Sequence, residues 1–199
     1  LYGSGNITIT DDAVIEESIG GSSGAGAGNS TGGAGIGGGA GGHGTIDISG
    51  NAQVKNALGK DGGAGIGSGH DGDGNVTISG NATIENAEGG KFAAGIGGGY
   101  GGDSNVTISG NAKIDNVSGG MQAAGIGGGY GAENDEDGNG NQITIKSNES
   151  GAPTVNATGG ESSIDEETAE KTPGGAGIGS GASKANANIT LSLIHISEP

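Results

Sequence analysis

The sequence predicts an all-β fold, a parallel β-helix (β-solenoid) built from short strands, and three observations lead to that prediction. The tetrapeptide Ala-Gly-Ile-Gly recurs four times at a spacing of 30 residues, and a fifth copy follows later; the copies start at Ala34, Ala64, Ala94, Ala124 and Ala176. A second phrase, Ile-Ser-Gly-Asn-Ala, lies between copies and starts at Ile48, Ile78 and Ile108. Apolar and polar residues alternate around both phrases. Such a period is typical of repeats that stack on their neighbours.

Each unit contains three short segments separated by turns, as the unit from 75 to 104 illustrates. Residues 76–78 (Val-Thr-Ile) alternate between apolar and polar, which is the pattern of a half-buried strand, and a Gly-Asn turn dipeptide follows. Residues 82–85 (Ala-Thr-Ile-Glu) alternate again before a Gly-Gly pair. Residues 94–97 (Ala-Gly-Ile-Gly) form the third segment, which further glycines end. Three short strands per unit of ~30 residues predict about five coils of a β-helix.

Stacking these coils would place equivalent apolar residues in columns inside the solenoid. The first predicted column contains Ile9, Ile48, Ile78, Ile108 and Ile145. The second contains Ile15, Val54, Ile84 and Ile114, and the third contains Ile36, Ile66, Ile96, Ile126 and Ile178. Each buried side chain contributes on the order of 1.5–3 kcal/mol. A single coil cannot bury its own column, so the stability must come from contacts between neighbouring coils.

Residues additional to the repeat lie near 22–31, 133–139 and 161–173, always between strands. A solenoid tolerates such insertions because the loops leave the surface while the strand ladder keeps its register. In the third insertion, Ser163 followed by Glu166 resembles a capping box and predicts a short helix. Residues 192–199 do not fit the repeat and resemble a translated sequencing adapter. We therefore expect residues 1–191 to be one β-solenoid fragment of a longer protein.

The composition narrows the classes of function. The chain has a net charge of -16, 52 Gly and no Cys, and all seven of its basic residues are Lys. Nucleic-acid binding is not expected, because it requires cationic neutralisation of phosphates. So many glycines with so few aromatic residues are common in disordered chains, but the regular placement of Ile argues against disorder. A bundle of polyglycine-type helices is the alternative architecture, and the strict alternation of Ile favours the β-helix.

The phrases AGIGGGYGG, NVTISGNA and NAEGG resemble the glycine-rich repeats of large secreted or wall-attached surface proteins of gut-type Gram-positive bacteria, from Asn6 to Leu191. The resemblance implies a right-handed β-helix, an extracellular location and no membrane insertion of this segment. It also implies a non-enzymatic stalk or carbohydrate-contacting adhesin module. The implied partners are polysaccharides or host glycans and other domains of the same chain. Two alternatives are a polysaccharide-degrading β-helix with its active site outside this fragment, and a purely structural spacer.

One column of the repeat predicts a binding surface. The sixth residue after the first Ala of each Ala-Gly-Ile-Gly copy reads, in order, Ala40, His70, Tyr100, Tyr130 and Ala182. The aromatic members of this column, which are His70, Tyr100 and Tyr130, would stack on one face. Sugar rings present apolar C–H faces to aromatic rings, so a glycan platform is one interpretation. The other is a simple aromatic stack that shields the glycine-rich turn.

Carboxylates on repeated positions raise the question of calcium, the one cofactor that the sequence suggests. Asp73 and Asp103 are one repeat apart and would stack as like charges, which a Ca²⁺ ion between coils would relieve. Oxygen ligands at Asp135, Asp137 and Asn139 match the start of an EF-hand loop, although a Lys stands where its bidentate Glu belongs. Solvated acidic side chains are the alternative interpretation.

Other polar patterns predict structure and no catalytic residue. Asn recurs in two rows, at 51, 81 and 111 and at 56, 86, 116 and 156, as expected for amide ladders. Lys55 and Glu85 are expected to pair across coils. No Cys is present as a nucleophile, and there is no Arg of the kind that β-helix polysaccharide lyases, by family resemblance, use as a base. The Gly-x-Gly-x-x-Gly matches precede no predicted helix, so they are not phosphate-binding loops.

Overall fold

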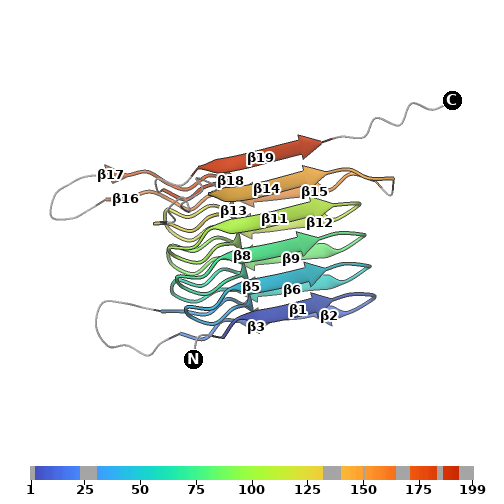
Figure 1. The fold of residues 1–199 in the computed structure, drawn as a ribbon, viewed down its shortest axis with the longest axis horizontal. Helices are drawn as coiled ribbons and strands as arrows, with labels where there is room; N and C mark the ends of the chain where they lie inside the picture. Colours follow the sequence, from blue (N-terminus) through green and yellow to red (C-terminus); the bar gives the residue numbers. More distant parts are fainter. Residues whose placement is uncertain are drawn as a thin grey trace.

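Every regular element that the structure describes is a β-strand. The structure is a computed structural model, and it describes residues 3–22, 31–131, 140–149, 151–164, 171–182 and 186–192. Within these residues there is no helix, and the strands form three sheets of parallel strands and one antiparallel sheet of two short strands. Figure 1 shows the strands stacked from β1 at one end to β19 at the other. The fold is therefore all-β and β-solenoid-like, as the repeat predicted.

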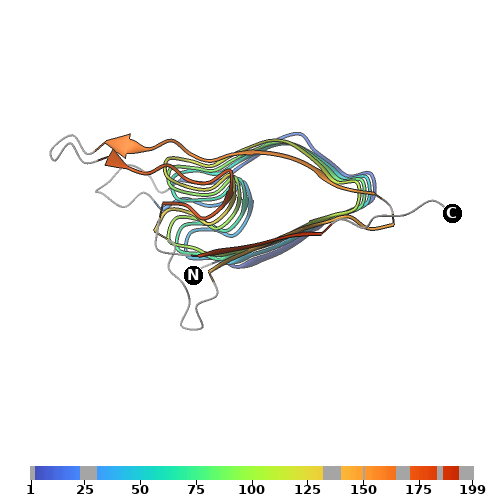
Figure 2. The same ribbon diagram turned by 90° about the horizontal axis from the view of Figure 1, so that it is seen from above.

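Each of the three sheets collects one segment from successive repeats. The first sheet has the order β1 (Gly5–Ile9), β5 (Gly44–Ile48), β8 (Gly74–Ile78), β11 (Ser104–Ser109), β14 (Asn141–Lys146) and β19 (Ala187–Ser192). The second has the order β2 (Val14–Ile15), β6 (Gln53–Leu58), β9 (Thr83–Glu88), β12 (Lys113–Ser118) and β15 (Thr154–Thr158), and β3 (Ser18–Ile19) also pairs with β6. The third has the order β4 (Ile36–Gly37), β7 (Ile66–Gly67), β10 (Ile96–Gly97), β13 (Ile126–Gly127) and β18 (Ile178–Gly179). Seen from above, the successive coils follow nearly the same outline (Figure 2).

The pairing register confirms all three predicted columns. Ile48 pairs with Ile78 in the first sheet, Val54 with Ile84 in the second, and Ile66 with Ile96 in the third. The second column also continues one step further than predicted, because Ile114 pairs with Val155. The central members of the columns are fully buried and form one hydrophobic core between the sheets. Hydrophobic side chains that repeat in register are thus what holds the coils together.

Glycine in the third sheet allows the backbones of neighbouring coils to approach closely. Gly67 has a φ of +144°, a conformation that L side chains rarely adopt. A Cβ atom built on Gly67 would lie 1.9 Å from the carbonyl oxygen of Gly97 in the next coil. No side chain fits there without moving the backbone. The second Gly of the Ala-Gly-Ile-Gly phrase therefore allows both the positive φ of the backbone and the close packing of neighbouring coils.

The third insertion contains two short strands, one near each of its ends. Ser163 belongs to β16 (Ser163–Ile164), which pairs in antiparallel fashion with β17 (Lys171–Thr172), and Glu166 lies outside the described residues. The predicted short helix would follow Ser163 and lies mostly outside the described residues, so it stays a prediction. Most of the predicted insertion 22–31, all of the predicted insertion 133–139 and residues 193–199 of the tail also lie outside the described residues. Ser192 is the last residue of β19.

Candidate functional site

Four aromatic side chains meet beside the glycine-rich third sheet, and we call them the aromatic cluster: His70, Phe92, Tyr100 and Tyr130. The ring centroids of His70 and Tyr100 are 4.8 Å apart, and those of Tyr100 and Tyr130 are 6.0 Å apart. The structure therefore brings together all three residues of the predicted aromatic column. Each of the four side chains is half-buried, so part of its surface faces solvent.

Phe92 is the member of the cluster that the column did not predict. Its ring centroid lies 5.9 Å from that of Tyr100 and 5.3 Å from that of Tyr130. The two columns meet because the backbone N–H of Tyr130 donates a hydrogen bond to the carbonyl oxygen of Phe92 at 2.8 Å. In the repeat, the position of Phe92 is occupied by Gly62 and Gln122, so a search along that column finds a single aromatic residue. Phe92 is recognised as a member of the cluster only from its contacts with Tyr100 and Tyr130.

The backbone at Phe92 is unusual for a bulky residue. Its φ is +68°, in the left-handed region that mainly Gly, Asn and Asp adopt. Two other repeat turns contain a left-handed residue, Asp61 with φ +49° and Gln122 with φ +63°. Asp tolerates this conformation well, and Gln122 is buried with its side chain hydrogen-bonded to Thr172. Phe92 instead directs its ring against the two tyrosines.

Charged groups flank the cluster on two sides. The Nζ atom of Lys91 lies 4.9 Å from the ring centroid of Phe92, a cation–π arrangement. The Nδ1 atom of His70 lies 3.0 Å from the Oδ2 atom of Asp71, and 15% of the His70 side chain is exposed. This contact places a carboxylate beside the imidazole ring that packs on Tyr100. The cluster thus presents apolar ring surface next to one ammonium and one carboxylate.

Gly62 lets the cluster pack closely against the backbone of the preceding turn. A Cβ atom built on Gly62 would lie 2.6 Å from Cδ2 of His70 and 3.0 Å from Cβ of Tyr100. The backbone N–H of Tyr100 donates to the carbonyl oxygen of Gly62 at 2.8 Å. The rings therefore do cover a glycine-rich turn, as the shielding interpretation of this column requires, and they also retain exposed surface.

The predicted calcium ligands Asp73 and Asp103 lie in adjacent coils, and the carboxylate of Asp73 bonds to the backbone of its neighbour. The backbone N–H of Asp103 donates to Oδ1 of Asp73 at 3.0 Å, and Nδ1 of His43 lies 3.4 Å from Oδ2 of Asp73. Among the residues that the structure describes, no group of three or more His, Cys, Asp or Glu side chains could hold a metal ion. The other suggested ligands, Asp135, Asp137 and Asn139, lie outside the described residues. Calcium binding stays a prediction.

The first Asn row forms the expected amide ladder. Nδ2 of Asn81 donates to Oδ1 of Asn51 at 3.0 Å, and Nδ2 of Asn111 donates to Oδ1 of Asn81 at 3.3 Å. The ladder ends on a carboxylate, because Nδ2 of Asn51 donates to Oδ1 of Asp12 at 3.0 Å. Asp12 suits this end position, because an ionised carboxylate accepts a hydrogen bond and has no proton of its own to donate.

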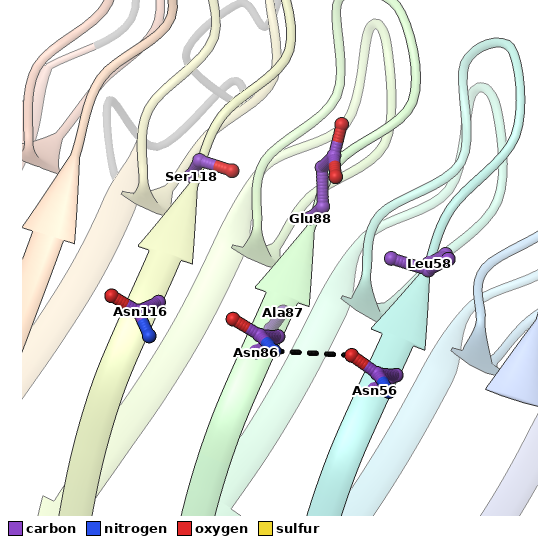
Figure 3. Close-up of a pocket in the computed structure, with 7 residues that line it drawn as sticks. All are labelled: Asn56, Leu58, Asn86, Ala87, Glu88, Asn116 and Ser118. Atoms are coloured by element: carbon purple, nitrogen blue, oxygen red, sulfur yellow. Dashed lines mark hydrogen bonds between the residues drawn. The ribbon is translucent and has the colours of Figure 1, made fainter. Parts of the chain in front are cut away.

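The second Asn row is interrupted and borders a shallow hollow on the second sheet. Nδ2 of Asn86 donates to Oδ1 of Asn56 at 3.1 Å, but Nδ2 of Asn116 donates to the backbone oxygen of Glu85 at 3.3 Å. Figure 3 shows the three amides side by side on β6, β9 and β12. The hollow has a volume of about 300 Å³ and is lined by Asn56, Leu58, Asn86, Ala87, Glu88, Asn116 and Ser118. Glu88 is the single carboxylate in this lining, so the hollow lacks the carboxylate pair of glycoside hydrolases.

Comparisons with known proteins give no relative for this chain. No protein-family model, no curated protein and no solved structure matches it. Within the described residues, no helix has the length and the apolar character needed to cross a membrane.

Proposed function

We propose that this chain is a non-enzymatic, extracellular segment of a bacterial surface protein that serves as a stalk and contacts carbohydrate through the aromatic cluster. We further propose that its coils, about five in number, form a right-handed, three-sided parallel β-helix. The observation that carries the proposal is the cluster itself: aromatic side chains from separate turns meet in one place and keep part of their surface exposed.

A stalk role is supported by the way the coils are joined. Three parallel sheets run the length of the stack, and the same residues pair in register from one coil to the next. Each added coil extends such a rod without changing its cross-section. A surface protein uses this property to hold other domains away from the cell.

Carbohydrate contact is supported by the chemistry of the cluster. Tyr100 and Tyr130 each combine an apolar ring with a hydroxyl group that can donate or accept a hydrogen bond. Sugars require the same combination, because their rings have apolar C–H faces and polar edges. The rest of the described surface offers mostly Gly, Asn, Thr and acidic side chains, so the cluster is distinct in chemical character. A spacer without a ligand remains the competing proposal.

Affinity electrophoresis of the whole chain in native gels tests the proposal. The gels would contain plant, mucin or bacterial-wall polysaccharides, with and without Ca²⁺. We expect at least one polysaccharide to slow the protein, and the Tyr100→Ala/Tyr130→Ala double variant to lose this retardation. The matched control is Thr77→Ala/Thr107→Ala, which alters two paired residues of the first sheet. No retardation with any polysaccharide would favour the spacer.

A further inference from the structure

We propose that the ligand of the aromatic cluster is an uncharged polysaccharide that lies along the solenoid axis over Tyr100 and Tyr130, and that Phe92 is the residue that positions these two rings. This inference rests on the proposed function and specifies both the class of its ligand and the residue that organises its site.

The direction of the ligand follows from the positions of the two tyrosines. Tyr100 and Tyr130 follow strands β10 and β13, which pair directly in the third sheet. Their rings therefore belong to successive coils and succeed one another along the axis, with centroids 6.0 Å apart and planes inclined by 47°. A chain of sugar rings running along the axis would meet both tyrosines in turn. A chain running across the axis would meet only one of them.

Phe92 fixes the relative position of the two tyrosines. Its ring is tilted against both, at interplanar angles of 56° to Tyr100 and 38° to Tyr130. The ring reaches this place because the backbone adopts a φ of +68°, which is unfavourable for a bulky side chain. Gly at this position would avoid the strain but would leave no ring between the tyrosines. The sequence thus retains a strained residue where its ring organises an exposed surface.

The charges around the cluster favour a ligand without carboxylates. Lys91 contributes one ammonium group at the Phe92 ring, and Asp71 contributes one carboxylate beside His70. These two charges cancel, while the chain as a whole has a net charge of -16. An anionic polysaccharide would therefore approach against the field of the protein with no local excess of cations to hold it. A neutral polysaccharide meets no such barrier.

The test uses pairs of polymers that differ only in charge. Native gels would contain xyloglucan, galactomannan or soluble starch, each beside the same polymer with part of its primary hydroxyl groups oxidised to carboxylates. We expect a neutral form to retard the chain and its oxidised form to bind roughly tenfold more weakly at low salt. Equal or stronger retardation by the oxidised polymers would overturn the inference about charge while leaving the proposed function intact. If none of the polymers in this set or in the wider panel retards the chain, the proposed function fails and the inference fails with it.

The role of Phe92 is tested by a substitution that removes its ring and also relieves the strain of its left-handed backbone conformation. Phe92→Gly should reduce the affinity for the retarding polymer roughly tenfold, because the tyrosines lose their common neighbour. The denaturation midpoint should stay close to that of the wild type, since the relief of strain offsets the lost ring contacts. Asp61→Gly is the matched control: it relieves a left-handed turn in the preceding coil and should leave the affinity unchanged. Unchanged binding by Phe92→Gly, or an equal loss in Asp61→Gly, would overturn the positioning role.

Discussion

The second and third sheets of this molecule both bury a column of branched side chains, but the third sheet also relies on close contact between glycine backbones. In the second sheet, columns of branched side chains such as Val54, Ile84 and Ile114 fill the interior, and all three are fully buried. In the third sheet the strands are two residues long, and glycine brings backbone against backbone, as at Gly67. In the aromatic cluster, His70, Tyr100 and Tyr130 lie in turns that follow strands of this sheet, and Phe92 lies in a turn that precedes one. Buried side chains therefore stabilise both walls, since Ile66 and Ile96 of the third sheet are fully buried as well, and the third sheet adds close contact between the backbones of neighbouring coils.

Replacing a glycine of the third sheet should have the largest effect. Gly67→Ala should destabilise the chain by about 4 kcal/mol, because the new Cβ atom would have to avoid the Gly97 carbonyl oxygen in an unfavourable backbone conformation. Urea denaturation followed by circular dichroism would measure the change. Gly3→Ala is the control, since a Cβ there meets nothing within 4 Å. Equal stability of the two variants would show that close backbone approach is not what holds this wall.

Truncating a side chain in the second sheet should have a somewhat smaller effect. Ile84 is fully buried at the centre of its column, so Ile84→Ala should cost about 3 kcal/mol through lost burial and the cavity left behind. Val14→Ala serves as control because 47% of Val14 is exposed. The same denaturation experiment compares them. A loss at Ile84 no greater than at Val14 would contradict the assignment of the core.

Cutting the amide ladder should weaken the chain less than either change above. Asn81 both donates to Asn51 and accepts from Asn111, so Asn81→Ala removes two hydrogen bonds and should cost about 1 kcal/mol at this exposed position. Asn116→Ala removes a single bond to a backbone oxygen and is the comparison. Thermal denaturation of the two variants would rank them. If Asn116→Ala were the more damaging, the ladder would not be a source of stability.

The smallest expected effect concerns a surface ion pair and depends on pH. Lys55 donates to Oε1 of Glu16 at 2.8 Å, and this hydrogen bond, with the negative charge of Glu16, raises the pKa of Lys55 above its ordinary value of 10.5. A raised pKa in the folded state means that the pair stabilises the fold at pH values below 10.5 and that this contribution is lost as the pH rises through the higher, folded-state pKa.

The Lys55–Glu16 pair is tested by comparing the melting temperatures of the wild type and Lys55→Met from neutral pH to alkaline pH. The difference in melting temperature should be small at neutral pH and should vanish at pH values well above 10.5. Lys113→Met offers a control, because Lys113 pairs within its own strand, with Asp115 at 2.7 Å, and joins no two coils. A difference that grows with increasing pH would contradict the assignment.

The repeat made the fold predictable because its period fixes which residues pair. Once Ile48 and Ile78 are recognised as equivalent, the register of the parallel strands follows, and the structure has that register. Contacts that break the repeat were harder to predict. Lys55 was expected to pair with Glu85, but it pairs with Glu16 in the preceding coil, where the spacing is 39 residues because of the first insertion.

The candidate site was predictable in part for the same reason. Tyr100 and Tyr130 occupy one position of the repeat, so their proximity could be read from the spacing. Phe92 belongs to a different column, and its contact with them depends on how the glycine-rich turns fold back on one another. Positive φ at a Phe is not encoded in any local pattern. Such contacts between columns become visible only in three dimensions.

We propose that the aromatic cluster binds the polysaccharide and that the buried columns stabilise the fold. The most direct test is native-gel retardation of Tyr100→Ala/Tyr130→Ala beside a core variant such as Ile84→Val, which should cost about 1 kcal/mol. We expect the tyrosine variant to stay folded and to migrate as if no polysaccharide were present, while the core variant remains retarded. Retardation of the tyrosine variant equal to that of the wild type would contradict the claim.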